Sequence, residues 1–293
     1  MSSRIREAFI CVLCLLLWLA AVPARAESPV WQIEKNGRLM FIGGTMHLLT
    51  PEDYPLPDAF ESAYRQSSKI VFETDLERLK SPEFQQYVNE QLSYSDGRGL
   101  RQVLRDDTYR EVAGFFEARG VPMSGIDRFK PGMVAMLMTL LELRRIGVVA
   151  VGVDDHFNSR LAQDGKTKGQ LETAEEQIGF IANMGDGNED AMLSYNLADL
   201  EELSSRWQEM TAAWRDGDMP ALYAIAAAPL RKEFPEVYRS LLPERNKAWM
   251  PKIEAFARSQ DVELLLVGAL HLAGKDGLLA ALAERGYSVR QLP

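Results

Sequence analysis

The stretch FIGGTMH, Phe41–His47, has a counterpart in LLVGALH, Leu265–His271. Each is an apolar run that ends in Gly-x-x-His, and the two lie at opposite ends of a 293-residue chain that contains only 3 histidines. The flanking sequence repeats as well, because a strand, Gly-x-x-His, a helix and a strand are expected over Leu39–Asp75 and again over Leu264–Leu292. This repetition predicts two related halves whose strands lie in one sheet.

The rest of the chain continues an α/β pattern. WQIEKNG and RLMFIGG predict a strand pair that turns at Asn36–Gly37, a strong hairpin motif. Helical periodicity dominates the centre, from about 81 to 256, and is clearest over 101–120, 131–147 and 196–218. No low-complexity linker interrupts it. The sequence therefore predicts one α/β domain over 27–293: a mixed sheet built from the two halves, with a large central helical insertion at about 81–256.

Residues 1–26 have the composition of a secretory signal peptide. A basic start, an apolar run over Ala8–Val22 and a small-x-small cleavage site at Ala24–Ala26 predict export across the inner membrane, to the periplasm of a Gram-negative bacterium. The apolar run is short for a membrane span, so we expect no membrane anchor after cleavage. Both cysteines, Cys11 and Cys14, would leave with this segment, which excludes disulfides and thiolate ligands from the mature protein.

The charge of the chain restricts its partners. The net charge is −9, and it becomes more negative once the three arginines and one glutamate of residues 1–26 are removed. An acidic protein is repelled by phosphate-rich surfaces. We therefore expect neither nucleic acid nor anionic lipid as a partner.

The two motif histidines are candidates for a shared site. Ligand sites gather at the carboxyl ends of parallel strands, where both His47 and His271 would emerge. Gly44 and Gly268, three residues before them, suit a tight turn or the close approach of a ligand. Glu73, in the apolar strand KIVFETD, is costly to bury unless it is paired or coordinates a metal, and a strand-end salt bridge is its structural alternative.

Two histidines and one carboxylate are a minimal ligand set for a divalent ion that keeps an open position for water. His47, Glu73 and His271 therefore predict a divalent transition metal; without cysteine, the set is compatible with zinc, manganese, cobalt or iron. The third histidine, His156, lies at an expected helix start. It is a possible neighbour of the site, and a surface or capping role is the alternative.

Six segments in order resemble the TraB/GumN family of bacterial proteins: FIGGTMHLL, IVFETDL, VGVDDHF, GKTKGQLETAEEQI, LLPERNKAWMPKI and LLLVGALHLAGKDGLL. That family belongs to a superfamily with the Tiki proteases, the erythromycin esterases and the ChaN-type haem-binding proteins. The resemblance covers essentially the whole mature chain. It implies a mixed α/β fold whose paired Gly-x-x-His motifs and acidic residue share one site, often proposed to be that of a metal-dependent hydrolase.

The resemblance also implies further site residues. The Arg-Asn pair of the family falls on Arg245 and Asn246, and its other acidic positions fall on Asp154 and Glu172. An arginine can hold a substrate carboxylate or stabilise an oxyanion, and a salt bridge on a helix surface is the alternative. The segment that follows Glu172 also fits a helix capping box over Thr173–Glu176, which needs no chemistry.

Two classes of function remain open from the sequence. The first is a periplasmic metal-dependent hydrolase that cleaves a small peptide or an ester, with Glu73 as ligand or general base and Arg245 at the oxyanion or substrate. The second is a binding protein that sequesters a peptide, a signal molecule or haem with the same residues and without turnover. Fold-level analogy does not decide between them.

Overall fold

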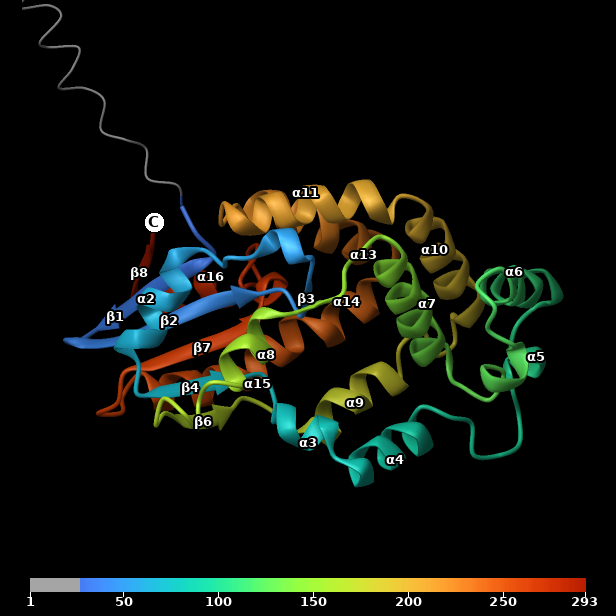
Figure 1. Ribbon diagram of the computed structural model, residues 1–293, viewed down its shortest axis with the longest axis horizontal. Helices are drawn as coiled ribbons and strands as arrows, with labels where there is room; N and C mark the ends of the chain where they lie inside the picture. The colour runs from blue at the N-terminus through green and yellow to red at the C-terminus, as the bar shows by residue number, and fades with distance from the viewer. Residues whose placement is uncertain (1–26) are drawn as a thin grey trace, which may run out of the picture.

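The computed structural model describes residues 27–293. The predicted signal peptide and the two cysteines lie outside the described residues. A six-stranded mixed sheet forms one end of the molecule, in the order β6-β4-β7-β2-β1-β8 (Figure 1). The strands are β1 (Val30–Lys35), β2 (Arg38–Thr45), β4 (Lys69–Phe72), β6 (Thr167–Gln170), β7 (Glu263–Gly268) and β8 (Ser288–Gln291).

Strands from the two ends of the chain meet at the centre of this sheet. β2 and β7 are parallel neighbours, and β4 is parallel to both β7 and β6, whereas β1 is antiparallel to β2 and to β8. The first half therefore runs from β2 to β4 and the second from β7 to β8. The predicted α/β fold with a mixed sheet is confirmed.

Two local sequence patterns have the structures expected of them. The β1–β2 hairpin turns at Asn36 (φ 53°) and Gly37 (φ 71°), and two successive residues at positive φ define a turn that suits the twist of the strands. β7 is the most buried strand, because helices cover both faces of the sheet. Leu264, Leu265, Leu266 and Val267 are fully buried, which explains its unbroken apolar run.

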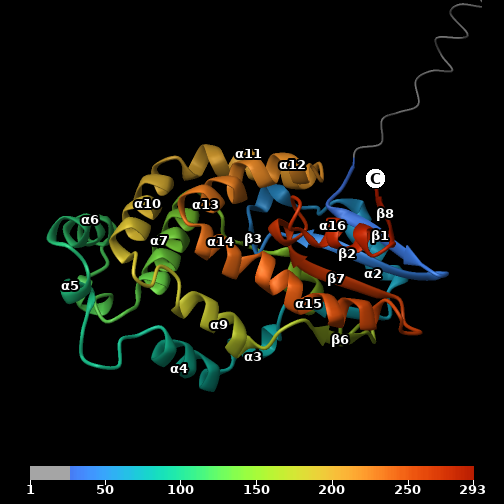
Figure 2. The ribbon, with the colours of Figure 1, turned by 180° about the vertical axis from the view of Figure 1, so that it is seen from behind.

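Helices cover the two faces of the sheet. α2 (Asp58–Gln66) and α8 (Val153–Asn158) lie on the face that Figure 1 presents. α15 (Pro243–Phe256) and α16 (Leu278–Glu284) lie on the opposite face, seen in Figure 2. Trp214, Phe60 and Phe157 pack together on the first face, with ring centroids 6.2 Å apart in the two pairs that Phe60 makes. The sheet is therefore the middle layer of a three-layer core.

Most of the remaining helices lie at the other end of the molecule, beyond the carboxyl ends of β2, β4 and β7 (Figures 1 and 2), although the helices Leu203–Arg215 and Met219–Leu222 also contribute Trp214, Met219 and Leu222 to the core around the sheet. They have their own apolar core, built mainly from α6, α7 and α10. The helices are α3 (Leu76–Lys80), α4 (Pro82–Gln91), α5 (Leu100–Val103), α6 (Asp106–Glu117), α7 (Pro131–Arg145), α9 (Ala174–Ala182), α10 (Glu189–Glu201), α11 (Leu203–Arg215), α12 (Met219–Leu222), α13 (Ala228–Glu233) and α14 (Pro235–Leu241), together with 3-10 helices η1 (Pro51–Asp53) and η2 (Met123–Gly125) and a π-helix, η3 (Tyr223–Ala227).

The predicted helical insertion departs from the structure in three places. It contains β6, an edge strand of the main sheet, and β5 (Ala150–Val151), which pairs with β3 (Leu48–Leu49). The sequence TKGQ of β6 is polar and largely exposed, so it has no apolar alternation to reveal a strand. The helix expected over 196–218 is divided at Glu202 into α10 and α11.

Within residues 27–293, no helix has both the length and the apolar character needed to cross a membrane.

Candidate active site

The two Gly-x-x-His motifs lie side by side, because β2 and β7 are neighbouring parallel strands. Thr45, the last residue of β2, is in register with Gly268, the last residue of β7. His47 follows β2 by two residues, and His271 ends the 3-10 helix η4 (Ala269–His271). The chain therefore leaves both strands at the sheet edge that faces the helical part, where ligand sites of parallel sheets are found.

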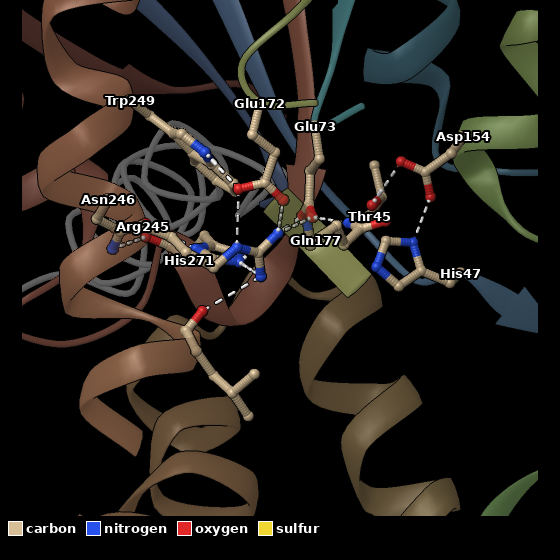
Figure 3. Close-up of polar contacts among 12 residues, drawn as sticks. Thr45, His47, Glu73, Asp154, Glu172, Gln177, Arg245, Asn246, Trp249 and His271 are labelled. Atoms are coloured by element: carbon tan, nitrogen blue, oxygen red, sulfur yellow. Dashed lines mark hydrogen bonds and ion pairs between the residues drawn. The ribbon is translucent and has the colours of Figure 1, made fainter. Parts of the chain in front are cut away.

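His47 is fixed by a buried carboxylate. Its Nδ1 lies 2.8 Å from Asp154 Oδ2, and Thr45 Oγ1 donates to the other carboxylate oxygen at 3.0 Å (Figure 3). The negative charge of Asp154 raises the pKa of His47 to about 9. Because an ionised carboxylate only accepts hydrogen bonds, this contact places a proton on Nδ1 and directs Nε2 away from Asp154. The side chain of His47 is 64% exposed, so the site opens to solvent at this residue.

His271 is buried and held through an amide. Its Nδ1 lies 2.7 Å from Asn246 Oδ1, while Asn246 Nδ2 donates to the carbonyls of His271 (3.1 Å) and Asp276 (2.9 Å). Since the amide nitrogen serves two carbonyls, Asn246 Oδ1 is the acceptor and His271 Nδ1 carries the proton. Burial lowers the pKa of His271 to about 3, so the ring is neutral and Nε2 has a lone pair. The ring centroid lies 4.3 Å from that of Trp249.

Glu73 lies between the two histidine motifs. It directly follows β4 and is buried. Oε1 accepts the Gly268 N–H at 2.7 Å, and Oε2 accepts Arg245 Nη2 at 2.7 Å and Gln177 Nε2 at 3.4 Å. Burial opposes ionisation, but His271 and Arg245 outweigh it and lower the pKa of Glu73 to about 2. The residue is therefore an anion at any pH near neutrality.

Arg245, in the first turns of α15, joins Glu73 to a second buried carboxylate. Its Nε and Nη2 donate to Glu172 at 3.1 and 2.6 Å, and its Nη1 donates to His271 Nε2 at 3.0 Å. Trp249 Nε1 also donates to Glu172, at 2.9 Å. Burial disfavours the charge of Arg245, but Glu73 and Glu172 raise its pKa, whereas burial raises the pKa of Glu172 itself. A buried cation thus lies between two acids.

Atoms of His47, Glu73 and His271 lie around the position that a side chain on Gly268 would take, and we call this position the hollow over Gly268. A methyl group on Gly268 would lie 3.2 Å from Glu73 Oε1, 3.5 Å from His47 Nε2 and 3.7 Å from His271 Cδ2. Glu73 Oε1 and His271 Nε2 are 3.8 Å apart. Two imidazole nitrogens and one carboxylate oxygen are donors that first-row divalent ions take. An acceptor on Nδ1 of each histidine is also the usual support of a metal-binding imidazole.

The spacing of these groups sets a condition on ion binding. Among residues 27–293, no three His, Cys, Asp or Glu side chains lie close enough together to hold a metal ion. Arg245 Nη1 donates a hydrogen bond to the lone pair of His271 Nε2, and Arg245 Nη2 donates one to Glu73 Oε2. The donor types fit an ion. Closure on it requires the Arg245 guanidinium to leave His271, and it requires His47, whose raised pKa keeps it protonated near neutral pH, to give up its Nε2 proton.

The structure brings together most of the residues that the sequence singles out, and leaves two outside. His156 lies in α8 with its ring 3.7 Å from Glu61 and 3.4 Å from Arg160, so it does not belong to the site. Gly44 serves packing, since a methyl group there would lie 3.2 Å from Cα of Ala269. The residues that meet are His47, Glu73, Asp154, Glu172, Arg245, Asn246, Gly268 and His271.

Three further residues complete the contacts: Thr45, Gln177 and Trp249. Thr45 stands inside the first Gly-x-x-His motif, and Trp249 lies one helical turn after Arg245, so their positions in the sequence are informative. Gln177 gives no such indication, because only the packing of α9 brings it to Glu73. All three donate hydrogen bonds to carboxylates of the site, namely those of Asp154, Glu73 and Glu172.

Fold and site together define a mixed α/β protein whose paired Gly-x-x-His motifs meet a buried acid–arginine cluster. The family model of the TraB/PrgY/gumN family matches residues 29–291, and the chain belongs to this family. Neither a comparison with curated proteins nor one with solved structures found a significant match.

Proposed function

We propose that the protein is a metal-dependent hydrolase whose ion is held by His47, Glu73 and His271. The observation that carries the proposal is the hollow over Gly268. Two histidines and one carboxylate border it, and each histidine has its Nδ1 on a buried acceptor, so that Nε2 is the atom left to face an ion. The ion is a divalent transition metal, namely zinc, manganese, cobalt or iron.

Each residue around the hollow has a separate role in the proposed hydrolysis. When bound, the ion lowers the pKa of water and polarises a carbonyl. Glu73, ionised at neutral pH, is a ligand or a general base for the attacking water. Arg245 holds a substrate carboxylate or stabilises the negative charge that develops on the carbonyl oxygen. Asn246 fixes the ring of His271 from behind, so that its Nε2 keeps one direction.

The substrate class follows from the same site and from the charge of the chain. We propose a small peptide or an ester, since water activation beside a buried cation suits attack on an acyl carbonyl. The chain is acidic, which supports neither nucleic acid nor anionic lipid as a partner. We also propose that residues 1–26 direct the protein to the periplasm and are then removed, with no membrane anchor left behind.

A specific observation favours a second candidate function. The three nitrogens of the Arg245 guanidinium are bonded to Glu172, Glu73, His271 and a main-chain carbonyl, so none of them is free to meet an oxyanion as the site stands. This arrangement also suits a protein that binds a peptide, a signal molecule or haem without turnover. A Soret band that appears on adding haem, and is lost with His47→Ala, would favour this candidate.

Hydrolysis is tested with the mature protein, residues 27–293, loaded in turn with zinc, manganese and cobalt. It is screened against unblocked and amino-blocked peptides and against p-nitrophenyl esters. Turnover is expected in the wild type and in His156→Ala, the matched control at the histidine outside the site, and not in His47→Ala. Turnover that needs no ion, or that is equal in His47→Ala, would contradict the proposal.

A further inference from the structure

A surface cavity lies at the opposite end of the sheet from the candidate active site. It is bordered by the end of β1, the start of β2, the end of α15 and the residue before β8, and its volume is about 460 Å³. Figure 2 shows the β1–β2 turn at the end of the sheet farthest from the helical part. We call this space the hairpin cavity. It is lined by Lys35, Asn36, Arg38, Glu254, Ala257, Arg258 and Tyr287.

The hairpin cavity is basic, although the chain as a whole is acidic. The net charge of the chain is −9, yet among the described residues that line the cavity three are cations and one, Glu254, is an anion. The lining therefore carries three positive charges against one negative charge, a net charge of +2. Glu254 is also shared: Arg258 lies 3.9 Å from one of its oxygens, and Arg285, beside the cavity, lies 3.5 Å from the other. The protein does not neutralise this local excess of positive charge.

Two of the three cations of the hairpin cavity have only neutral partners. Lys35 Nζ donates to the carbonyl of Arg285 and lies 4.6 Å from the centre of the Tyr287 ring. Arg38 Nη1 donates to the carbonyl of Ser259 at 2.7 Å. Neither side chain forms an ion pair within residues 27–293. Since an ammonium has three N–H donors and a guanidinium has five, both groups have donors left for a ligand.

The hairpin places the same two cations opposite each other. Lys35 and Arg38 are cross-strand partners, the last pair before the turn, so their side chains lie on the same face of the strands. Like charges in directly opposite positions destabilise a strand pair. The turn itself needs only the positive φ of Asn36 and Gly37, so the hairpin does not require these cations. An anion bound between Lys35 and Arg38 would replace their repulsion by two attractions.

We propose that the hairpin cavity binds the phosphate group of a small soluble molecule. A phosphate monoester carries nearly two negative charges at neutral pH and has three oxygens that accept hydrogen bonds strongly. This charge matches the net charge of the lining. Arg38 and Arg258 bind the oxygens through their forks of N–H donors, and Lys35 acts as a point charge. A carboxylate has one negative charge and two oxygens, so it balances only half of the excess charge.

The charge of the whole chain favours a small ligand over a membrane surface. A lipid bilayer with anionic headgroups is an extended negative surface, and it would also meet the acidic remainder of the protein, which it repels. A single phosphate group meets only the lining of the hairpin cavity. No ligand of the proposed metal site lines this cavity, so the phosphate site stands whether or not the protein is a hydrolase.

Titration calorimetry of residues 27–293 with glycerol 3-phosphate and with glycerate tests the proposal. The protein is first treated with EDTA and desalted, so that no active-site ion can bind phosphate. Glycerol 3-phosphate is expected to bind saturably at one site, and glycerate at least about tenfold more weakly. Arg38→Gln and Arg258→Gln each remove a charged donor and are expected to weaken glycerol 3-phosphate about tenfold. Arg65→Gln, at an exposed arginine of α2, is the matched control and is expected to bind like the wild type.

A variant with the opposite expected effect completes the test. Glu254→Gln removes the anion of the lining and is expected to strengthen glycerol 3-phosphate binding roughly threefold. Arg258 is 68% exposed, so Arg258→Gln is expected to fold like the wild type, and thermal melts check every variant.

Three results would overturn the proposal. One is the absence of saturable glycerol 3-phosphate binding to the wild type. Another is wild-type affinity in both Arg38→Gln and Arg258→Gln, because the phosphate would then bind elsewhere. The third is sedimentation of the protein with phosphatidylglycerol vesicles that Arg38→Gln abolishes, because the ligand would then be a lipid surface; the wild type is expected to stay in solution.

Discussion

Gly268→Ala is expected to remove ion binding and leave the fold intact. Gly268 has φ −50° and ψ 133°, which alanine adopts without strain. Because alanine leaves the unfolded chain less conformational freedom than glycine does, the substitution stabilises the fold by about 0.4–1 kcal/mol. The new methyl lies 3.2 Å from Glu73 Oε1, and this tight contact destabilises the fold by a similar amount. The free energy of unfolding should therefore change by less than about 1 kcal/mol. Because the same methyl fills the hollow between the three donors, ion affinity should fall by about 100-fold or more.

Two measurements separate these effects. Urea unfolding gives the stability, and competition with a chromogenic chelator gives the zinc affinity. Gly179→Ala is the matched control, since its methyl would meet nothing within 4 Å and it lies in α9, beside the site. It is expected to keep wild-type zinc affinity. Wild-type zinc affinity in Gly268→Ala would refute the assignment of the hollow as the ion site.

Three further variants test other parts of the account. Asp154→Asn should lower ion affinity about 10–100-fold and return the pKa of His47, read by NMR titration, from about 9 towards its ordinary value of 6.5. Arg245→Met leaves two buried carboxylates without their cation and should cost about 3–5 kcal/mol in urea unfolding, part of which a second change, Glu172→Gln, should restore. Glu263 is fully buried, its Oε2 is unpaired, and burial raises its pKa. The protonated side chain therefore stabilises the fold fully below pH 4.5, the pKa of an ordinary glutamate, and this stabilisation is lost as the pH rises through the folded-state pKa. Glu263→Gln should therefore increase stability more at pH 8 than at pH 4, and equal gains at both pH values would contradict this reasoning.

The sequence predicts the centre of the fold well, because local rules govern it. The turn at Asn36–Gly37 needs positive φ, and the apolar run of β7 needs burial on both faces, so both can be recognised from residue types alone. β6 and the division between α10 and α11 cannot. TKGQ is a strand because β4 offers it a partner, and nothing in the residues around Glu202 forbids a continuous helix.

The site, like the fold, has a part that local sequence patterns predict and a part that they do not. His47 and His271 can be paired from the repeated motif, since equivalent positions after parallel strands meet at one edge. Glu172 and Arg245 lie far apart in the sequence, and spacing alone gives no reason for them to form a bidentate pair. His156 shares its residue type with the two motif histidines, but it follows no strand of the main sheet and lies elsewhere. Position at a strand end is therefore more informative than residue type.

Metal content is the most direct test of the central claim, that His47, Glu73 and His271 hold one ion. Residues 27–293 would be purified without chelator or His-tag, beside His47→Ala, His271→Ala and the control His156→Ala, and each would be analysed for transition metals. The account predicts about one equivalent in the wild type and the control, and none in the other two variants while they remain folded. No metal in the wild type, even after reconstitution with zinc, manganese and cobalt, or equal metal in all four proteins, would contradict it.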